Sequence, residues 1–396
     1  MACLSCLKAA ALAAAALAFA APAEAATLHA YIGTYTADPA EPRSGAANHG
    51  DGIYLVDVDG TTGAISHARL AAKTLSPSWM ALSAGGKFLY AVSEVASYGP
   101  AKSGSVSAFA VGAGGALKLL NTVSSEGAIP AYISLHPSGH FAMVADYTGG
   151  AYAIIRIKPD GSLGEATDVV KPSGPLNPPT AKDTQPGQFA TSDHRGSRGH
   201  MIGPDRSGQF VIGDDAGRDQ IFVWKLDTSS GKLNQVSVTK VLPGAAPRHF
   251  VFSPDGKTMY QLLEQDSRLA VFDFKAGKLT QEGTSVSGLP DGYAGSNTAS
   301  ELLISKDGKR LYFGNRTEDS IGVFSADGDN VKRIANVPTE GDTPRSLALD
   351  PSGEFLYSLN QKADNVTAFR IGTDGVPKFT GKYLPLGSPA AMVFLK

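Results

Sequence analysis

The chain has 396 residues with 35 basic and 37 acidic side chains, so its formal net charge is only −2. This balance argues against a nucleic-acid partner, whose backbone requires a broad basic face, but it allows a local basic pocket. The 45 glycines and 24 prolines favour many short strands joined by turns over long helices, and the length is sufficient for one or two large cores.

The first 26 residues form a segment of their own. Lys8 precedes the apolar run of residues 10–21, and small residues follow it. This pattern predicts a secretory signal peptide over residues 1–26, cleaved near Ala25 or Ala26, because the run is too short to anchor the chain comfortably in a bilayer. Both cysteines lie in this segment, so the mature chain should have no disulfide, and no later stretch is apolar enough to span a membrane. We therefore expect a periplasmic or secreted protein with no membrane partner after cleavage.

The remaining residues, 27–396, repeat one hairpin. Residues 246–264 show it best: Pro247 leads an alternating apolar run, a Pro-Asp-Gly turn follows, and a second run ends at Glu264. Six complete copies occur, and their turn glycines lie roughly 45–70 residues apart, a period typical of blade-like repeats. These glycines are Gly86, Gly139, Gly208, Gly256, Gly308 and Gly353.

A second hairpin occurs seven times, from GIYLVDVDGTTGAI at 52–65 to VTAFRIGTDGV at 366–376. The missing seventh copy of the first hairpin is explained by the two ends of the mature chain. Residues 27–36 match its second strand, and residues 388–396 match its first. Pairing of these two segments predicts an all-β fold, a single seven-bladed β-propeller whose ring is closed by the N- and C-terminal strands.

Residues 171–198 interrupt the period between the third and fourth blades. The segment is rich in proline, glycine and polar residues, and a loop of this length in a compact domain is usually functional or disordered. It is either a flap over a substrate or a surface loop without a role.

Each inner hairpin should begin and end at the same mouth of the central channel, because its two strands run antiparallel. The residue after the leading proline, or its counterpart, is therefore expected to lie beside the residue eight positions past the turn glycine. The first of these positions holds Ser78, Ala131, His200, Arg248, Ser300, Arg345 and Ala390. The second holds Glu94, Tyr147, Ala216, Glu264, Arg316 and Gln361.

The fourth to sixth blades concentrate ionisable groups on one arc, which we interpret as a catalytic site. His200, Arg248, Glu264 and Arg316 combine a general base, a carboxylate and two guanidiniums, as the hydrolysis of an anionic, ester-like substrate requires. The arginines can hold a carboxylate or phosphate and stabilise an oxyanion. Glu264, kept ionised by Arg248, can orient His200 or activate water.

Five more residues at or beside these positions are expected to bind substrate: Arg345, Asn315, Asp215, Glu94 and Gln361. A purely structural salt bridge remains an alternative for Arg345, as does a simple inter-strand pair for Arg248 and Glu264. Strand alternation places His249 on the side opposite Arg248, so we expect His249 to pack or to orient other groups. No cysteine or histidine spacing indicates a metal, and no phosphate-binding or dinucleotide motif is present, so we expect no cofactor.

Several long strings carry a resemblance to a known family. They are YIGTYT (31–36), DYTGGAY (146–152), PRHFVFSPDG (247–256), FGNRTEDSIGVF (313–324) and EGDTPRSLALDPSGEFLYSLNQKADNVTAF (340–369). Through them the chain resembles the seven-bladed β-propeller lactonases, which include propeller-type 6-phosphogluconolactonases and the fungal carboxy-cis,cis-muconate cyclase. The resemblance implies an active site of one histidine, two arginines and one glutamate, which match His200, Arg248, Arg316 and Glu264.

Three functions remain open at this point. The first is a lactonase, acting as a monomer on a small sugar-derived or other carboxylate- or phosphate-bearing lactone. The second is a muconate-type cycloisomerase that uses the same residues to close a lactone ring. The third is a binding platform without catalysis, because propellers often serve that role. Trp79 and Tyr132 either contribute to an exposed patch for such binding or pack inside.

Overall fold

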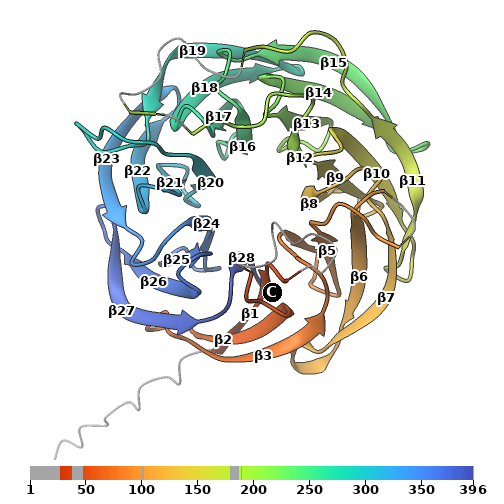
Figure 1. Ribbon diagram of the computed structural model, residues 1–396, viewed down its shortest axis with the longest axis horizontal. Helices are drawn as coiled ribbons and strands as arrows, with labels where there is room; N and C mark the ends of the chain where they lie inside the picture. The colour runs from red at the N-terminus through yellow and green to blue at the C-terminus, as the bar shows by residue number, and fades with distance from the viewer. Residues whose placement is uncertain (1–26, 38–47, 100–101, 179–186, 189, 396) are drawn as a thin grey trace, which may run out of the picture.

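The computed structural model describes residues 27–37, 48–99, 102–178, 187–188 and 190–395. The predicted signal peptide therefore lies outside the described residues. The strands form seven four-stranded antiparallel sheets arranged radially around a central axis, which confirms the seven-bladed β-propeller (Figure 1). Within this part of the chain there is no α-helix, only one 3-10 turn at Ala113–Gly115. The described residues contain no helix with the length and apolarity needed to cross a membrane.

Each sheet runs from an inner strand at the axis to an outer strand at the rim. The first three sheets are β28 (Pro389–Phe394), β1 (Thr27–Thr34), β2 (Gly52–Asp59) and β3 (Ile65–Lys73); β4 (Met80–Leu82), β5 (Phe88–Ser93), β6 (Ser105–Val111) and β7 (Leu117–Ser124); and β8 (Pro130–Leu135), β9 (Phe141–Asp146), β10 (Ala151–Ile157) and β11 (Leu163–Val170). The other four are β12 (Gly199–Pro204), β13 (Phe210–Asp215), β14 (Gln220–Asp227) and β15 (Lys232–Lys240); β16 (Pro247–Phe252), β17 (Thr258–Leu263), β18 (Arg268–Lys275) and β19 (Lys278–Ser287); β20 (Ala299–Ile304), β21 (Arg310–Asn315), β22 (Ser320–Asp327) and β23 (Asn330–Pro338); and β24 (Pro344–Leu349), β25 (Phe355–Asn360), β26 (Asn365–Ile371) and β27 (Pro377–Pro385).

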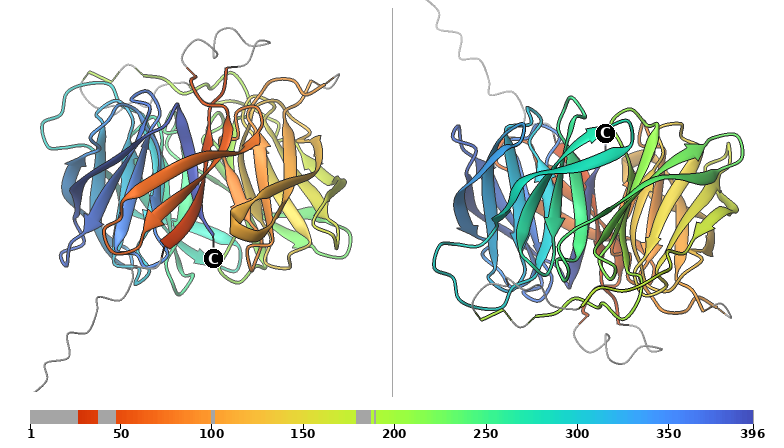
Figure 2. Two further views of the ribbon diagram at one scale, coloured as in Figure 1. Left: turned by 90° about the horizontal axis from the view of Figure 1, so that it is seen from below. Right: turned by 90° about the horizontal axis from the view of Figure 1, so that it is seen from above.

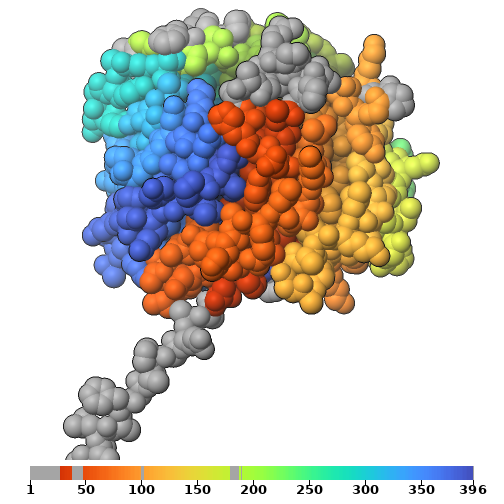
Figure 3. All heavy atoms as spheres, turned by 60° about the horizontal axis from the view of Figure 1, so that its bottom comes forward, coloured from red at the N-terminus to blue at the C-terminus, as the bar shows by residue number. Residues whose placement is uncertain are grey.

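The two ends of the mature chain close the ring as the sequence predicts. β28 pairs antiparallel with β1, with Ala30 opposite Phe394 and Tyr31 opposite Val393. Figure 3 shows the red–orange N-terminal strands and the blue C-terminal strands side by side on the outer surface, where β3 contacts β27. One blade is therefore built from both ends of the mature chain and held together by backbone hydrogen bonds.

The repeated turn glycines have a conformational reason. Gly256, between β16 and β17, has φ +72, and the other five turn glycines also have positive φ values. Side chains with a Cβ atom rarely adopt this left-handed region. The turn is completed by Ser253, whose hydroxyl donates to Asp255 Oδ1 and accepts from the Thr258 N–H. The left-handed turn conformation explains why a glycine occurs at the same position in each hairpin.

The apolar core lies between adjacent blades. Phe250, Met259 and Phe272 of the fifth sheet along the chain pack against Ile212 and Val223 of the preceding sheet in one cluster. Similar clusters fill the other interfaces between blades. Because the apolar groups are used between the blades, the ends of the inner strands are free to carry polar side chains along the axis.

The described part of the 171–198 segment lies on the face of the ring opposite the C-terminus (Figure 2). Gln188 donates to the carbonyl oxygens of Gln265 and Asn297, each at 2.8 Å, and the Ala190 N–H donates to Ser296 Oγ. The segment therefore crosses the ends of the fifth and sixth blades at the mouth that the sequence predicts to carry the site.

Candidate active site

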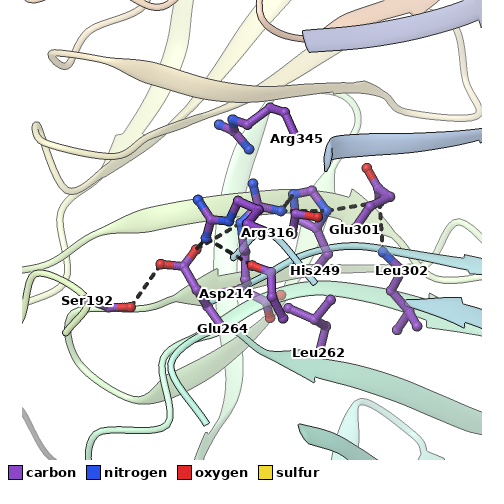
Figure 4. Close-up of polar contacts among 12 residues, drawn as sticks. Ser192, Asp214, His249, Leu262, Glu264, Glu301, Leu302, Arg316 and Arg345 are labelled. Carbon is purple, nitrogen blue, oxygen red and sulfur yellow. Dashed lines mark hydrogen bonds and ion pairs between the residues drawn. The ribbon is translucent and has the colours of Figure 1, made fainter. Parts of the chain in front are cut away.

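A buried ion cluster joins three of the predicted catalytic residues. Arg248 is the second residue of β16, Glu264 follows β17, and Arg316 follows β21. Glu264 Oε2 lies 2.9 Å from Arg248 Nε and 2.8 Å from Arg316 Nη2 (Figure 4). Arg248 Nε does not direct its hydrogen at the carboxylate, so that contact is an ion pair without an aligned hydrogen bond. The loop residue Ser192 donates to Glu264 Oε1 at 2.8 Å.

The cluster carries one more positive than negative charge. Arg248 is 0% exposed, and its Nη2 atom has no hydrogen-bond partner among the residues described. Arg316 is 21% exposed at the side chain, and its Nη2 also donates to the Ala299 carbonyl. A buried guanidinium with an unused donor is unfavourable unless an acceptor satisfies it. The geometry is therefore suited to an incoming anion or to a developing oxyanion.

His200, the second residue of β12, is buried next to this cluster. Its ring makes edge contacts with Tyr147 at 5.6 Å and with His249 at 5.1 Å between centroids. Burial lowers the pKa of His200 well below its usual range, and the charges of His249, Arg345 and Arg316 act in the same direction. Its Nδ1 has no partner within the described part of the chain. These effects favour the neutral form of the His200 imidazole, whose Nδ1 lone pair or N–H is not used by another described residue.

His249 also points toward the axis, and the predicted opposite orientation is wrong. The pairing of β16 with β17 shifts register between Pro247 and His249, so Arg248 is the extra residue of a β-bulge. The bulge interrupts the side-chain alternation, and the Nη1 atom of Arg248 lies 3.3 Å from His249 Nδ1. The two-residue period of a strand sequence does not reveal such a bulge. In the structure, a similar register shift occurs at the start of most inner strands.

Glu301, which sequence reasoning missed, holds His249 in place. His249 Nδ1 lies 3.0 Å from Glu301 Oε1, and this oxygen also accepts the Leu302 N–H at 3.0 Å. On its other side, the His249 ring makes edge contacts with the stacked rings of Trp79 and Tyr132, whose centroids are 4.6 Å apart. Trp79 and Tyr132, both half-buried, therefore pack against His249.

Arg345 and Glu94 come together elsewhere at the mouth through Tyr35. Arg345 Nε donates to the Tyr35 hydroxyl at 2.9 Å, and this hydroxyl donates to Glu94 Oε2 at 2.9 Å. The Nη2 atom of Arg345 lies 3.7 Å from the same carboxylate oxygen. Figure 4 shows Arg345 apart from the Glu264 cluster and without a drawn contact to it. The charge of Arg345 contributes to the lowered pKa of His200.

Three predicted binding residues make contacts within or between the blades. The fully buried Asp215 carboxylate accepts from Ser197 and from the N–H groups of Arg198 and Arg218. Asn315, also fully buried, bonds to Asn297, the Gly288 carbonyl and Ser320. Each of these residues is the last one of its strand, so its side chain points away from that of the next residue. Both side chains hold loops in place inside the blades. The backbone N–H of the half-buried Gln361 donates to the Thr343 carbonyl.

The described part of the 171–198 segment contributes directly to the site through Ser192. The Ser192 N–H donates to Gln265 Oε1 at 2.6 Å, which fixes the backbone beside the Glu264 contact. His194 is a second anchor, with Nε2 3.3 Å from Asp219 Oδ1. Burial alone would lower the pKa of His194, but the hydrogen bonds to Asp219 and to the Ser192 carbonyl outweigh it and raise that pKa. Of the two interpretations of the segment, the geometry favours a cover over the mouth.

No group of three or more His, Cys, Asp or Glu side chains suited to a metal occurs among the described residues. The ionisable groups that the structure brings together are a neutral imidazole, a carboxylate shared by two guanidiniums, and unused guanidinium donors. This set can activate water, bind an anion and stabilise negative charge on a carbonyl oxygen.

Residues 29–394 match the family described as "Lactonase, 7-bladed beta-propeller". The chain is similar to the 6-phosphogluconolactonase of Bacillus subtilis, with 27% identity over 86% of this chain and 90% of the relative. It is also similar to a 6-phosphogluconolactonase of Formosa agariphila, with 29% identity over 87% and 96% of the two chains. Among solved structures, the periplasmic gluconolactonase of Pseudomonas aeruginosa superposes with a TM-score of 0.81 at 25% identity, covering 94% of this chain and 99% of that one.

Proposed function

The chain belongs to the seven-bladed β-propeller lactonase family and is a lactone hydrolase; we propose that its substrate is an anionic, sugar-derived lactone bound at the channel mouth. The observation that carries the anionic class is the excess positive charge at the mouth, where Arg248, Arg316 and Arg345 face two carboxylates, those of Glu264 and Glu94. The names of the relatives support a sugar-derived ring, since they are 6-phosphogluconolactonases and a gluconolactonase.

The proposed mechanism assigns the base to His200. Neutral imidazole takes a proton from water as the water oxygen bonds to the lactone carbonyl carbon. The resulting oxyanion accepts hydrogen bonds from the guanidinium of Arg248 or Arg316. The ring C–O bond then breaks, and the imidazolium returns its proton to the leaving alkoxide, which gives the open hydroxy acid.

Glu264 orients the arginines in this mechanism, while Arg345 binds the anion. Glu264 Oε2 is shared by two guanidiniums and Oε1 accepts from Ser192, so both carboxylate oxygens already have contacts. Arg345 lies across the mouth, pre-positioned by the Tyr35 hydroxyl. A substrate that spans the mouth therefore places its carbonyl at Arg248 and Arg316 and its phosphate or carboxylate at Arg345.

The test is a comparison of three lactones by pH-stat titration of the acid released. Substrates are 6-phospho-D-glucono-1,5-lactone, D-glucono-1,5-lactone and neutral δ-valerolactone. A charge-assisted hydrogen bond contributes about 1.5–3 kcal/mol, so kcat/KM should favour the phosphorylated lactone by about 10–100-fold over the unphosphorylated sugar. Arg345→Gln should remove most of this preference, whereas Arg206→Gln, at an exposed turn, should retain it. Equal rates for the sugar lactones would refute the anionic class, and no hydrolysis of any lactone would refute the site.

We also propose that the protein is exported and acts as a monomer. The basic and apolar pattern of residues 1–26 supports export, and one structural neighbour is described as periplasmic. Ring closure by β28 and β1 leaves no unpaired inner strand for a second copy to complete. Mass spectrometry of exported protein should find an N-terminus near Ala26, and light scattering should give the mass of one chain. Retention of Cys3 in the exported protein would contradict signal cleavage.

A further inference from the structure

A cavity lies at the end of the channel opposite the mouth; we call it the distal chamber. Its volume is 530 Å³, within the range of small-molecule sites. The inner strands begin at the mouth with residues such as Arg248 and end at the distal chamber with residues such as Val251. The apolar part of its wall includes Met201, Phe250, Leu303, Leu349, Met392 and Phe394.

A layer of aromatic rings lies between the distal chamber and the catalytic histidine. Trp79 and Tyr132 line the chamber and stack on each other, and the edge of His249 packs on both. The His249 ring in turn contacts His200 on the mouth side. The chamber is therefore distinct from the lactone site.

Two buried polar atoms belong to residues of this otherwise apolar wall. Glu301 uses Oε1 for His249 and for the Leu302 N–H, but its Oε2 has no hydrogen-bond partner among the described residues. The side chain of Glu301 is 6% exposed. Ser346, 1% exposed, likewise has an Oγ without a partner in the described part of the chain. An unmatched carboxylate oxygen in an apolar environment is strongly unfavourable, so the chamber is complementary to a ligand that brings hydrogen-bond donors and positive charge.

We propose that the distal chamber binds a small amphiphilic cation, a primary alkyl- or arylalkyl-ammonium. Its ammonium group donates to Glu301 Oε2 and Ser346 Oγ, and its hydrocarbon body contacts the methionine, leucine and phenylalanine side chains of the wall. An ammonium has three donors, which suits two acceptors on the wall. The stacked rings of Trp79 and Tyr132 add a favourable surface for a cation. An anionic amphiphile is excluded by the carboxylate.

The experiment uses n-hexylammonium as the probe, with 1-hexanol and hexanoate as charge controls of equal chain length. Isothermal titration calorimetry on the mature protein at pH 7.5 should give one hexylammonium per chain, bound at least tenfold tighter than 1-hexanol, and no binding of hexanoate. Equal affinities for the ammonium and the alcohol would overturn the proposal. No binding of any probe would also overturn it, because the chamber would then hold water only.

Two variants and one control locate the binding. Glu301→Gln keeps the shape of the side chain and should weaken hexylammonium binding at least tenfold, while Glu165→Gln, an exposed carboxylate on β11, should leave it unchanged. If Glu301→Gln fails to fold, Leu349→Trp provides the test instead. Leu349 is half-buried in the wall of the chamber, and the larger tryptophan side chain should fill the chamber and abolish binding. Unchanged binding in either folded variant would refute the assigned site. None of these measurements uses lactonase activity, so failure here leaves the proposed hydrolysis untouched.

Discussion

The Nε atom of Arg248 lies 2.9 Å from the Oε2 atom of Glu264 where the β16–β17 hairpin reaches the mouth. Glu264 follows Leu263, the partner of Pro247, and the bulged Arg248 reaches it with its side chain at the end of the hairpin. Arg248 is wholly buried and Glu264 nearly so. An ion pair removed from water in this way is stable only while both charges are present.

Replacing Glu264, the acidic member of this pair, should destabilise the protein strongly. Glu264→Ala leaves the Arg248 guanidinium buried without a counter-charge, and we expect a loss of about 3–5 kcal/mol in the free energy of unfolding, measured by urea denaturation at neutral pH. The matched control is Glu354→Ala, which breaks the exposed Glu354–Arg370 pair and should cost at most about 1 kcal/mol. Similar losses for the two variants would mean that the mouth pair is hydrated.

Removing the proposed base should affect turnover and leave the fold nearly unchanged. His200→Gln retains a side chain of similar size but cannot accept a proton near neutral pH, so kcat for lactone hydrolysis should fall about 10²–10⁴-fold. The melting temperature should change by only a few degrees. His140→Gln, at an exposed histidine, should leave kcat unchanged. Full activity of His200→Gln would transfer the role of base to another group.

The pH dependence of hydrolysis should reflect the lowered pKa of His200. The neutral imidazole is the active form, and burial keeps His200 neutral at pH values below the usual histidine pKa of 6.5. The acid limb of kcat/KM should therefore lie below pH 6.5, with activity lost only as the pH falls through the lowered pKa. An acid limb at or above pH 6.5, measured by initial rates in constant-ionic-strength buffers, would exclude a buried His200 as the base.

A buried carboxyl beneath the mouth should make stability fall as the pH rises. Burial raises the pKa of Asp214 from 3.8 to about 8, although a hydrogen bond from Gln261 opposes the shift. Between pH 3.8 and 8 the folded chain keeps a proton that the unfolded chain releases, so wild-type stability decreases over this window. Asp214→Asn has no such proton, and its stability relative to wild type should increase by up to about 1.4 kcal/mol per pH unit from pH 5 to 8.

The control for this prediction is Asp59→Asn. Hydrogen bonds from the Thr62 and Thr61 N–H groups lower the pKa of Asp59, so this carboxyl is ionised in both states from pH 5 to 8. Its denaturation midpoints should therefore run parallel to those of wild type. Parallel curves for Asp214→Asn as well would show that Asp214 is ionised in the folded protein.

Local sequence patterns determined the ring and the approximate position of its site. Alternating runs and left-handed turn glycines such as Gly256 define each hairpin, and the unmatched end strands leave only one way to complete the seventh blade. The antiparallel hairpin then fixes which residues meet at its open end. This reasoning brought Arg248, Glu264 and Arg316 together, because their spacing depends on backbone geometry that repeats in each blade.

Only the tertiary structure decided which neighbouring side chains join them. The bulge at Arg248 turns His249 toward the axis, and Glu301 reaches His249 from the adjacent blade. Ser192 arrives from a segment without periodicity. Asp215, predicted to bind substrate, instead uses its carboxylate for backbone N–H groups within its own blade. Such contacts depend on packing between elements distant in the chain, and a two-residue strand period carries no information about them.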